Sequence, residues 1–348
     1  MLTASLLLLY IHREVSAADS IWALHIHDGL RCWILGGSLV DRRSFRGKMP
    51  VRFSDMSNLA SPKTVSRLLE MLFTCTAFSL ARAAGLRGWS GAFATFAMFT
   101  WCFSFVATLL VFLAEFTQFH SLLALSWKNL PVTVAAFSAL MNMAASVTYP
   151  LMVLSVAVAQ ENWSELSSPY QIAAALASCL AFLAYSVELL VLLLLLNKDE
   201  EGRTAYMATG PGLLKVLEVS LACVVCVTLA TVNSPEFAGF RWAVGALCAC
   251  ALLSLAVILI MVGECRARCP FPFTRLLLVF SALAFLLQGA VLAVWTLQLR
   301  REARGLDKCS QMNCRWNQML LSAALIALNL TAYLTDLIYS IQLSCCRS

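Results

Sequence analysis

The sequence predicts an all-α membrane protein with eight transmembrane helices. Of its 348 residues, 60% are hydrophobic and only 13% are charged, which leaves too little polar surface for a water-soluble globule of this size. The apolar runs, such as residues 189–196, are continuous and do not alternate with polar residues. Only helices or closed barrels satisfy the backbone within lipid, and continuous runs favour helices over barrel strands.

Eight apolar segments give the predicted helices. Each has the roughly 20 residues that a helix needs to cross a hydrocarbon core of about 30 Å. Short polar loops separate them, and Pro131, Pro150 and Pro211 fall at or near their ends. In chain order, the segments cover residues 65–84, 93–116, 131–153, 172–196, 213–232, 242–262, 276–297 and 320–343.

The net charge of +6 is spread among the loops and forms no dense basic stripe, so a nucleic-acid partner is not indicated. Because Lys and Arg concentrate in cytoplasmic loops, their distribution favours a cytoplasmic N-terminus. The loop at residues 298–318 disagrees with this orientation, which would place it outside, and its side stays open. Its basic residues are Arg300, Arg301, Arg304, Lys308 and Arg315.

Two features nevertheless favour the orientation. Asn162 begins the glycosylation sequon Asn162-Trp163-Ser164 in a predicted external loop. Cys309 and Cys314 share the basic loop, where an oxidising compartment would allow a disulfide between them. Because such a sequon also arises by chance, both a glycosylated and an unmodified Asn162 stay open.

Fourteen cysteines raise the question of a metal or redox site. Cys223 and Cys226 have a suitable spacing, but no second pair and no histidine lie nearby, which favours packing as small hydrophobic residues. The sequence also lacks motifs for hydrolysis and phosphate binding, so we predict neither an enzyme nor a bound cofactor or metal. Four cysteines flank predicted cytoplasmic helix ends and are candidates for palmitoylation or plain thiols: Cys265, Cys269, Cys345 and Cys346.

Residues 1–48 do not follow the pattern of the rest. Their apolar run at residues 6–11 is too short to span a membrane and lacks the preceding basic residues of a signal peptide. A disordered tail is favoured over a metal site at the histidines of this stretch. Met49 opens a polar lead into the first helix, so we consider it a candidate start of the native protein.

The second half of the helical region repeats the first. Residues 67–70 (Arg-Leu-Leu-Glu) correspond to residues 215–218 (Lys-Val-Leu-Glu) at an offset of 148 residues. Residues 184–189 and 332–337 correspond at the same offset. A common offset at both ends of a unit indicates two tandem four-helix units. An even number of spans gives both units one orientation, unlike the inverted repeats of many transporters.

Several charged residues lie inside predicted helices, where insertion scales assign each a cost of roughly 2.5 to 3.5 kcal/mol. Arg67 and Glu70 are three positions apart, as are Lys215 and Glu218, so each pair can neutralise itself along one helix face. Glu115 lies close to a helix end, from which its carboxylate can reach the interface.

Glu188 and Asp336 have no such neighbour in their own helices. A structural interpretation, which we favour, pairs Glu188 with Arg67 and Asp336 with Lys215 across helices. A functional interpretation makes these carboxylates part of a proton or cation path. The repetition of a suitable cation in both units favours the structural interpretation.

Three segments carry a family resemblance: residues 99–103 (Phe-Thr-Trp-Cys-Phe), 125–129 (Leu-Ser-Trp-Lys-Asn), and 206–209 (Tyr-Met-Ala-Thr) followed by 211–218. They resemble the myeloid-associated differentiation marker family, and the resemblance extends from Met49 to the end. It implies two MARVEL domains, each of four transmembrane helices. It also implies a non-enzymatic role in cholesterol-rich membrane domains, vesicle trafficking and the placement of signalling proteins at the plasma membrane.

We therefore expect an N-terminal extension and polar lead (1–64), a first MARVEL unit (65–196), a cytoplasmic linker (197–212), and a second MARVEL unit with a short tail (213–348). The expected function is that of a multi-pass scaffold that organises raft-like domains of the plasma membrane. Its expected partners are membrane lipids, with cholesterol as a candidate, and other membrane or signalling proteins. The alternative is a transporter or channel that uses Glu188 and Asp336.

Overall fold

Long α-helices make up nearly all of the structure, which is a computed structural model. It describes residues 61–84, 92–117, 126–160, 169–198, 205–232, 238–263, 273–302 and 315–345, and these ranges contain no strand. In chain order the elements are α3 (Pro62–Ala83), α4 (Ala92–Phe116), α5 (Leu130–Gln160), α7 (Pro169–Lys198), the 3-10 helix η3 (Tyr206–Ala208), α8 (Gly210–Val232), α9 (Ala238–Val262), α10 (Phe273–Glu302) and α11 (Arg315–Cys345).

Seven of the eight long helices in the described ranges are long and apolar enough to cross a membrane. The exception is α3, which has 22 residues but carries Lys63, Arg67, Glu70 and Arg82, and these charges lower its hydropathy. The all-helical membrane fold is therefore confirmed, and eight transmembrane helices are confirmed only in part. The crossing of α3 stays a prediction.

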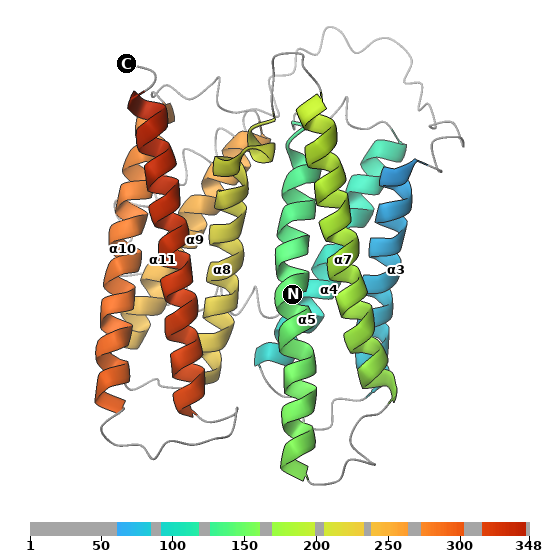
Figure 1. Ribbon diagram of the computed structural model, residues 1–348, viewed down its shortest axis with the longest axis horizontal. Helices are drawn as coiled ribbons and strands as arrows, with labels where there is room; N and C mark the ends of the chain where they lie inside the picture. Colours follow the sequence, from blue (N-terminus) through green and yellow to red (C-terminus); the bar gives the residue numbers. More distant parts are fainter. Residues whose placement is uncertain are drawn as a thin grey trace, which may run out of the picture.

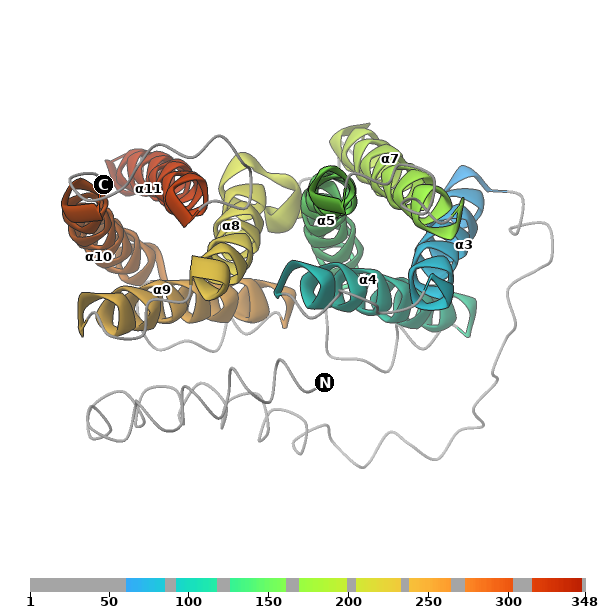
Figure 2. The same cartoon turned by 90° about the horizontal axis from the view of Figure 1, so that it is seen from below.

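The long helices form two groups of four that lie side by side (Figures 1 and 2). The first group contains α3, α4, α5 and α7, and the second contains α8 to α11. In each group the first helix packs against both the second and the fourth. Helix α8 also contacts α4 and α5, so it joins the two groups. The grouping has the chain order that the sequence repeat predicts, while the MARVEL assignment of the groups stays a prediction.

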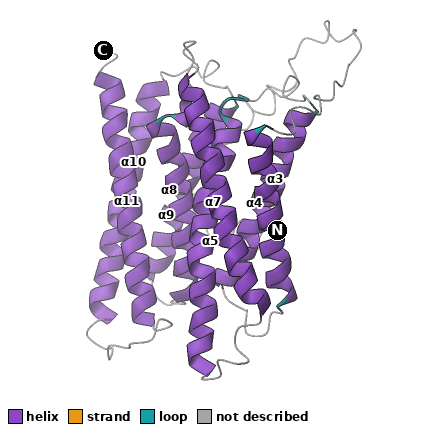
Figure 3. Ribbon diagram, turned by 45° about the vertical axis from the view of Figure 1, so that its right-hand side comes forward, coloured by secondary structure: helices purple, strands orange, loops and turns teal. Residues whose placement is uncertain are grey.

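The helices lie roughly along one common axis (Figure 3), and consecutive helices run in alternating directions, as the sequence colouring of Figure 1 shows. The start of α8 and the ends of α7 and α11 therefore lie at one end of the molecule, the top of Figure 1. The end of α10 and the start of α11 lie at the opposite end, which places Arg301 and Arg315 away from Lys198 and Cys345. Which end faces the cytoplasm stays a prediction.

Alanine is the commonest buried apolar residue, beside a few large side chains such as Trp101 and Trp295, and many leucines face outward. Ala77, Ala97 and Ala181 are buried, whereas Leu176 and Leu286 are more than 60% exposed. Small interfacial residues allow membrane helices to approach closely, because lipid provides no hydrophobic force to drive them together. The exposed leucines are therefore placed to contact lipid.

The ends of two helices show how local sequence sets the elements. The side-chain oxygen of Ser61 accepts a hydrogen bond from Thr64 N at 3.3 Å and caps α3, whose first residue is Pro62. Helix α5 includes Pro150 and continues to Gln160, beyond the predicted end at residue 153. Proline is tolerated within membrane helices because neighbouring groups satisfy the freed carbonyl.

Candidate functional site

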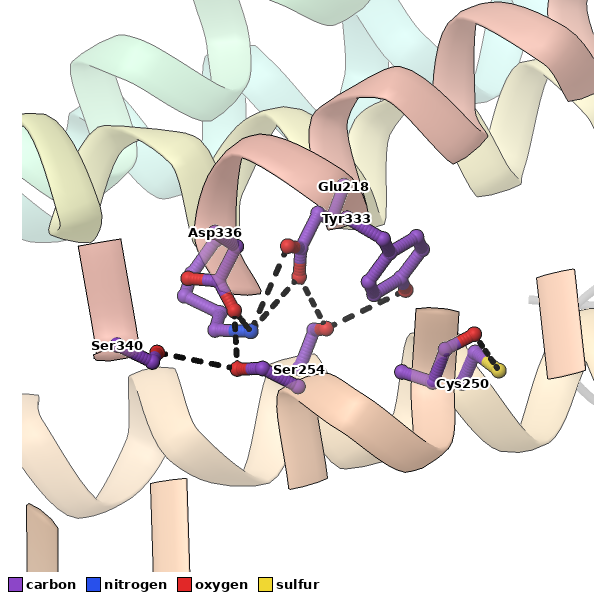
Figure 4. Close-up of polar contacts among 9 residues, drawn as sticks. Glu218, Cys250, Ser254, Tyr333, Asp336 and Ser340 are labelled. Carbon is purple, nitrogen blue, oxygen red and sulfur yellow. Dashed lines mark hydrogen bonds and ion pairs between the residues drawn. The ribbon is translucent and has the colours of Figure 1, made fainter. Parts of the chain in front are cut away.

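The structure gathers buried charges into two clusters, one in each helix group. The second-group cluster forms around Lys215 on α8 (Figure 4). Its Nζ lies 2.7 Å from Asp336 Oδ2 on α11 and 3.1 Å from Glu218 Oε2 on its own helix. Ser254 Oγ of α9 donates to Glu218 Oε2 at 2.6 Å, and Ser281 Oγ of α10 donates to Asp336 Oδ2. Each carboxylate thus has a cation and a hydroxyl as partners.

Tyr333 extends this cluster toward the middle of α11. Its hydroxyl lies 3.3 Å from Ser254 Oγ, and Lys215 Nζ lies 5.9 Å from the centre of its ring (Figure 4). The ring face adds a favourable cation–π contact to the ammonium group. Ser281 Oγ also lies 3.3 Å from Ser340 Oγ, so polar groups from all four helices of the group join one network.

The first-group cluster forms around Arg67 on α3. Arg67 Nε donates to Glu188 Oε1 of α7 at 2.6 Å, and Arg67 Nη1 bonds to Glu115 Oε2 of α4. Glu70 bonds instead with Ser66, whose Oγ lies 3.5 Å from Glu70 Oε1. The predicted neutralisation along one helix face therefore occurs at Lys215 and Glu218 but not at Arg67. Glu115, predicted to reach for the interface, is an ion-pair partner while 37% of its side chain stays exposed.

Both clusters share one plan. Arg67 and Glu188 are 121 residues apart, as are Lys215 and Asp336, and each ion pair joins the first and fourth helices of its group. In each group a tyrosine lies one turn before the acidic residue: Tyr185 before Glu188, and Tyr333 before Asp336. Tyr185 Oη lies 2.7 Å from Thr108 Oγ1 on α4, and Tyr333 Oη lies 3.3 Å from Ser254 Oγ on α9. The two pairings are those that the structural interpretation of the sequence expects; their role stays a prediction.

The cluster geometry favours holding helices together over binding a metal. Within the described ranges, no group of three or more His, Cys, Asp or Glu side chains is arranged to hold a metal ion. In each cluster the carboxylates already form ion pairs with a guanidinium or an ammonium group. Removing water from such a pair strengthens its attraction, but leaving either partner alone in a dry interior is costly.

A third polar site, at Asn129, joins the two helix groups. Asn129 Oδ1 accepts from Met207 N of η3 at 3.1 Å, and its Nδ2 donates to Met261 O of α9 at 3.3 Å. Ser126 N donates to Val262 O, also of α9, at 2.7 Å. The residues before α5 thus bind the end of α9 and the turn that leads into α8. Sequence reasoning missed this junction, although residues 125–129 and 206–209 both stood out as motifs.

Curated relatives reveal the family. A myeloid-associated differentiation marker homolog of Xenopus laevis is 35% identical over 302 residues, which cover 82% of this chain and 94% of that protein. The chain belongs to the myeloid-associated differentiation marker family. The human marker is 34% identical over 298 residues, with 82% and 89% covered, and the mouse marker-like protein 2 is 32% identical over 289 residues, with 81% and 92% covered.

Two further comparisons give no match. No family model matches this chain, and no solved structure matches it. The names of its relatives describe differentiation markers and name no enzyme activity, which is consistent with the predicted absence of catalysis. The family membership that the motifs at residues 99–103, 125–129 and 206–218 indicated is confirmed.

The structure places only part of the predicted modification sites of this family member. Cys345 is exposed at the end of α11. The sulfur atoms of Cys226 and Cys248 of α9 lie 4.0 Å apart. Cys226 therefore has a neighbouring cysteine on another helix in addition to Cys223 on its own helix. The other candidates lie outside the described residues: Asn162, Cys265, Cys269, Cys309, Cys314 and Cys346. The same is true of residues 1–48 and Met49.

Proposed function

We propose that this protein is a non-enzymatic scaffold of the plasma membrane, which organises raft-like lipid domains and positions signalling or trafficking proteins within them. The observation that carries the proposal is the way the intramembrane charges are bound. Glu188 and Asp336 each lie within 2.7 Å of a cation on another helix. Ion pairs of this kind fix helices to one another, whereas a transport path needs carboxylates that are free to exchange their partners.

The lengths of the spans support a sterol-rich membrane. The seven apolar helices contain 23 to 31 residues. At about 1.5 Å per residue, the shortest of them, α8, is about 35 Å long. That length fits the thicker sterol- and sphingolipid-rich plasma membrane, at about 32–33 Å, better than the thinner membrane of the endoplasmic reticulum, at about 27 Å.

The outward-facing side chains supply the surface on which a scaffold would act. Large apolar residues are exposed on helices of both groups, including Leu110, Leu183, Leu259 and Leu286. These surfaces can make broad apolar contact with lipid or with a neighbouring transmembrane helix. The proposed partners are ordered lipids, with cholesterol as a candidate, and other membrane or signalling proteins.

A reconstitution experiment tests the proposal against a transporter or channel. The purified full chain would be placed in giant vesicles of saturated lipid, unsaturated lipid and cholesterol that separate into ordered and disordered phases. We expect enrichment in the ordered phase. Parallel small vesicles that contain a pH-sensitive dye, under an imposed proton or potassium gradient, should leak no faster than vesicles without protein.

Two results would overturn the proposal. Exclusion from the ordered phase would contradict raft organisation. A flux that the wild-type protein supports and the double variant Glu188→Gln with Asp336→Asn abolishes would establish the transport function instead. Circular dichroism of the double variant would first show that its helices are intact.

A further inference from the structure

Glu70 and Glu218 occupy equivalent positions of the repeat but have different surroundings. Glu218 receives Lys215 Nζ at 3.1 Å and Ser254 Oγ at 2.6 Å, so its carboxylate is held by a cation and a hydroxyl (Figure 4). Glu70 receives only Ser66 Oγ, at 3.5 Å, which is long for a hydrogen bond between oxygen atoms. The second repeat thus provides an internal comparison, a buried glutamate whose carboxylate has a cation and a hydroxyl as partners.

The remaining oxygen of Glu70 has no donor. Oε2 is buried and lacks a hydrogen-bond partner among the described residues, and no part of Glu70 is exposed. Arg67, three positions earlier, directs its bonds to Glu188 and Glu115 on other helices. The carboxyl group of Glu188, on the facing helix α7, lies close enough to Glu70 to interact with it.

Two carboxylates cannot face each other in a dry interior without a proton between them. An ionised carboxylate that lacks both water and a donor is among the most costly groups to bury. When two carboxyl groups share one site, the like charges repel, and one of them holds its proton. A protonated Glu70 becomes a donor, and its O–H can bond to the Glu188 carboxylate that already accepts from Arg67.

We propose that Glu70 binds a proton, which makes the first-group cluster a buried proton-binding site that the second-group cluster lacks. The charge balance supports this assignment. With Glu70 neutral, the first cluster contains Arg67 and two ionised carboxylates, those of Glu115 and Glu188. The second cluster likewise contains one cation, Lys215, and two ionised carboxylates. With Glu70 ionised, the first cluster would hold an additional uncompensated charge.

The titratable groups around Glu70 come from three helices. Arg67 lies on the same helix, Glu188 and Tyr185 lie on α7, and Glu115 on α4 binds the other side of the Arg67 guanidinium. Helix α5, the remaining helix of the group, contains no Asp, Glu, Lys, Arg or His. Arg67 is the one cation among these neighbours. Its Nε and Nη1 bond to the other two glutamates, and its buried Nη2 has no hydrogen-bond partner among the described residues.

Infrared difference spectroscopy of the purified full chain in lipid tests the proposal. A protonated carboxylic acid has a C=O stretching band that an ionised carboxylate lacks and that shifts in deuterium oxide. Glu70→Gln should remove one such band from the wild-type spectrum. The matched variant Glu218→Gln should remove none, because Lys215 and Ser254 favour the ionised form of Glu218. Since an amide resembles a neutral acid, Glu70→Gln should also melt at the wild-type temperature, whereas Glu218→Gln should melt several degrees lower.

Either of two outcomes would overturn the proposal. One is a Glu70→Gln spectrum that retains every acid band of the wild type. The other is a Glu70→Gln protein that fails to fold or melts as low as Glu218→Gln, because the neutral amide would then not replace the native group. Neither outcome depends on lipid-phase partitioning, so failure here leaves the scaffold function standing and failure of the scaffold function leaves the proton site standing.

Discussion

Arg67 and Lys215 are equivalent residues that bind their carboxylates differently. The planar guanidinium of Arg67 presents several donors in fixed directions, which lets it reach Glu188 on α7 and Glu115 on α4 at once. The ammonium group of Lys215 is a compact charge and contacts Glu218 on its own helix as well as Asp336 on α11. The identity of the cation therefore decides which helices each cluster joins.

The two partners of Arg67 should differ in their effect on stability. Glu188 is buried, so Glu188→Gln leaves an arginine charge in the interior without its main partner, and we expect a loss of about 3–5 kcal/mol in the free energy of unfolding. Glu115 is 37% exposed, and Glu115→Gln should cost about 0–1 kcal/mol because solvent or headgroups screen the pair. Unfolding of the purified variants in mixed micelles measures both. Equal losses would contradict this ranking.

At the scale of elements, the turn η3 packs directly against the start of α8. A Cβ atom at Gly212 would lie 2.3 Å from Tyr206 O and 2.7 Å from Met207 Cα, both backbone atoms that cannot rotate away. Glycine at this position lets the turn and the helix approach closely enough for Met207 N to reach Asn129. The close packing at the junction of the helix groups therefore explains why the motif at residues 206–212 contains a glycine at position 212.

Gly212→Ala and Gly210→Ala test this packing. The first must displace the backbone of η3, so we expect it to cost at least about 1–3 kcal/mol, the usual range for overpacking. The second should be tolerated, because its nearest neighbour would be the Tyr339 hydroxyl at 3.7 Å, an ordinary contact distance. Thermal melting of both variants in detergent gives the comparison. A Gly210→Ala variant as unstable as Gly212→Ala would show that the close approach is not the cause.

The positions of the helices could be predicted from the sequence, whereas some of their partners could not. Apolar length alone locates α4 and α8 to within a few residues, and the repeat places Glu188 opposite Arg67 and Asp336 opposite Lys215. The contact between Arg67 and Glu115 depends on the relative rotation of α3 and α4, which no local pattern records. Asn129 escaped notice because a single polar residue at a helix start has no periodicity.

Across the whole molecule, the alternating helix directions make a prediction about sidedness. Tags placed just before residue 62 and after residue 345 should be accessible from one side of the membrane. Tags in the connections at residues 161–168 and 303–314 should be accessible from the other, because the helices that flank them end there. Antibody labelling of intact and permeabilised cells reports each position. A tag before residue 62 on the same side as residues 161–168 would show that α3 does not cross.

The central claim is that each helix group is held by an ion pair between its first and fourth helices. Double-mutant cycles on the free energy of unfolding test it most directly. Within a group, Lys215→Met and Asp336→Asn should be coupled by about 0.5–3 kcal/mol, as expected for residues in contact. Across groups, Arg67→Met and Asp336→Asn should be additive within about 0.3–0.5 kcal/mol. Additive effects within the group, or equal coupling across the groups, would contradict the account.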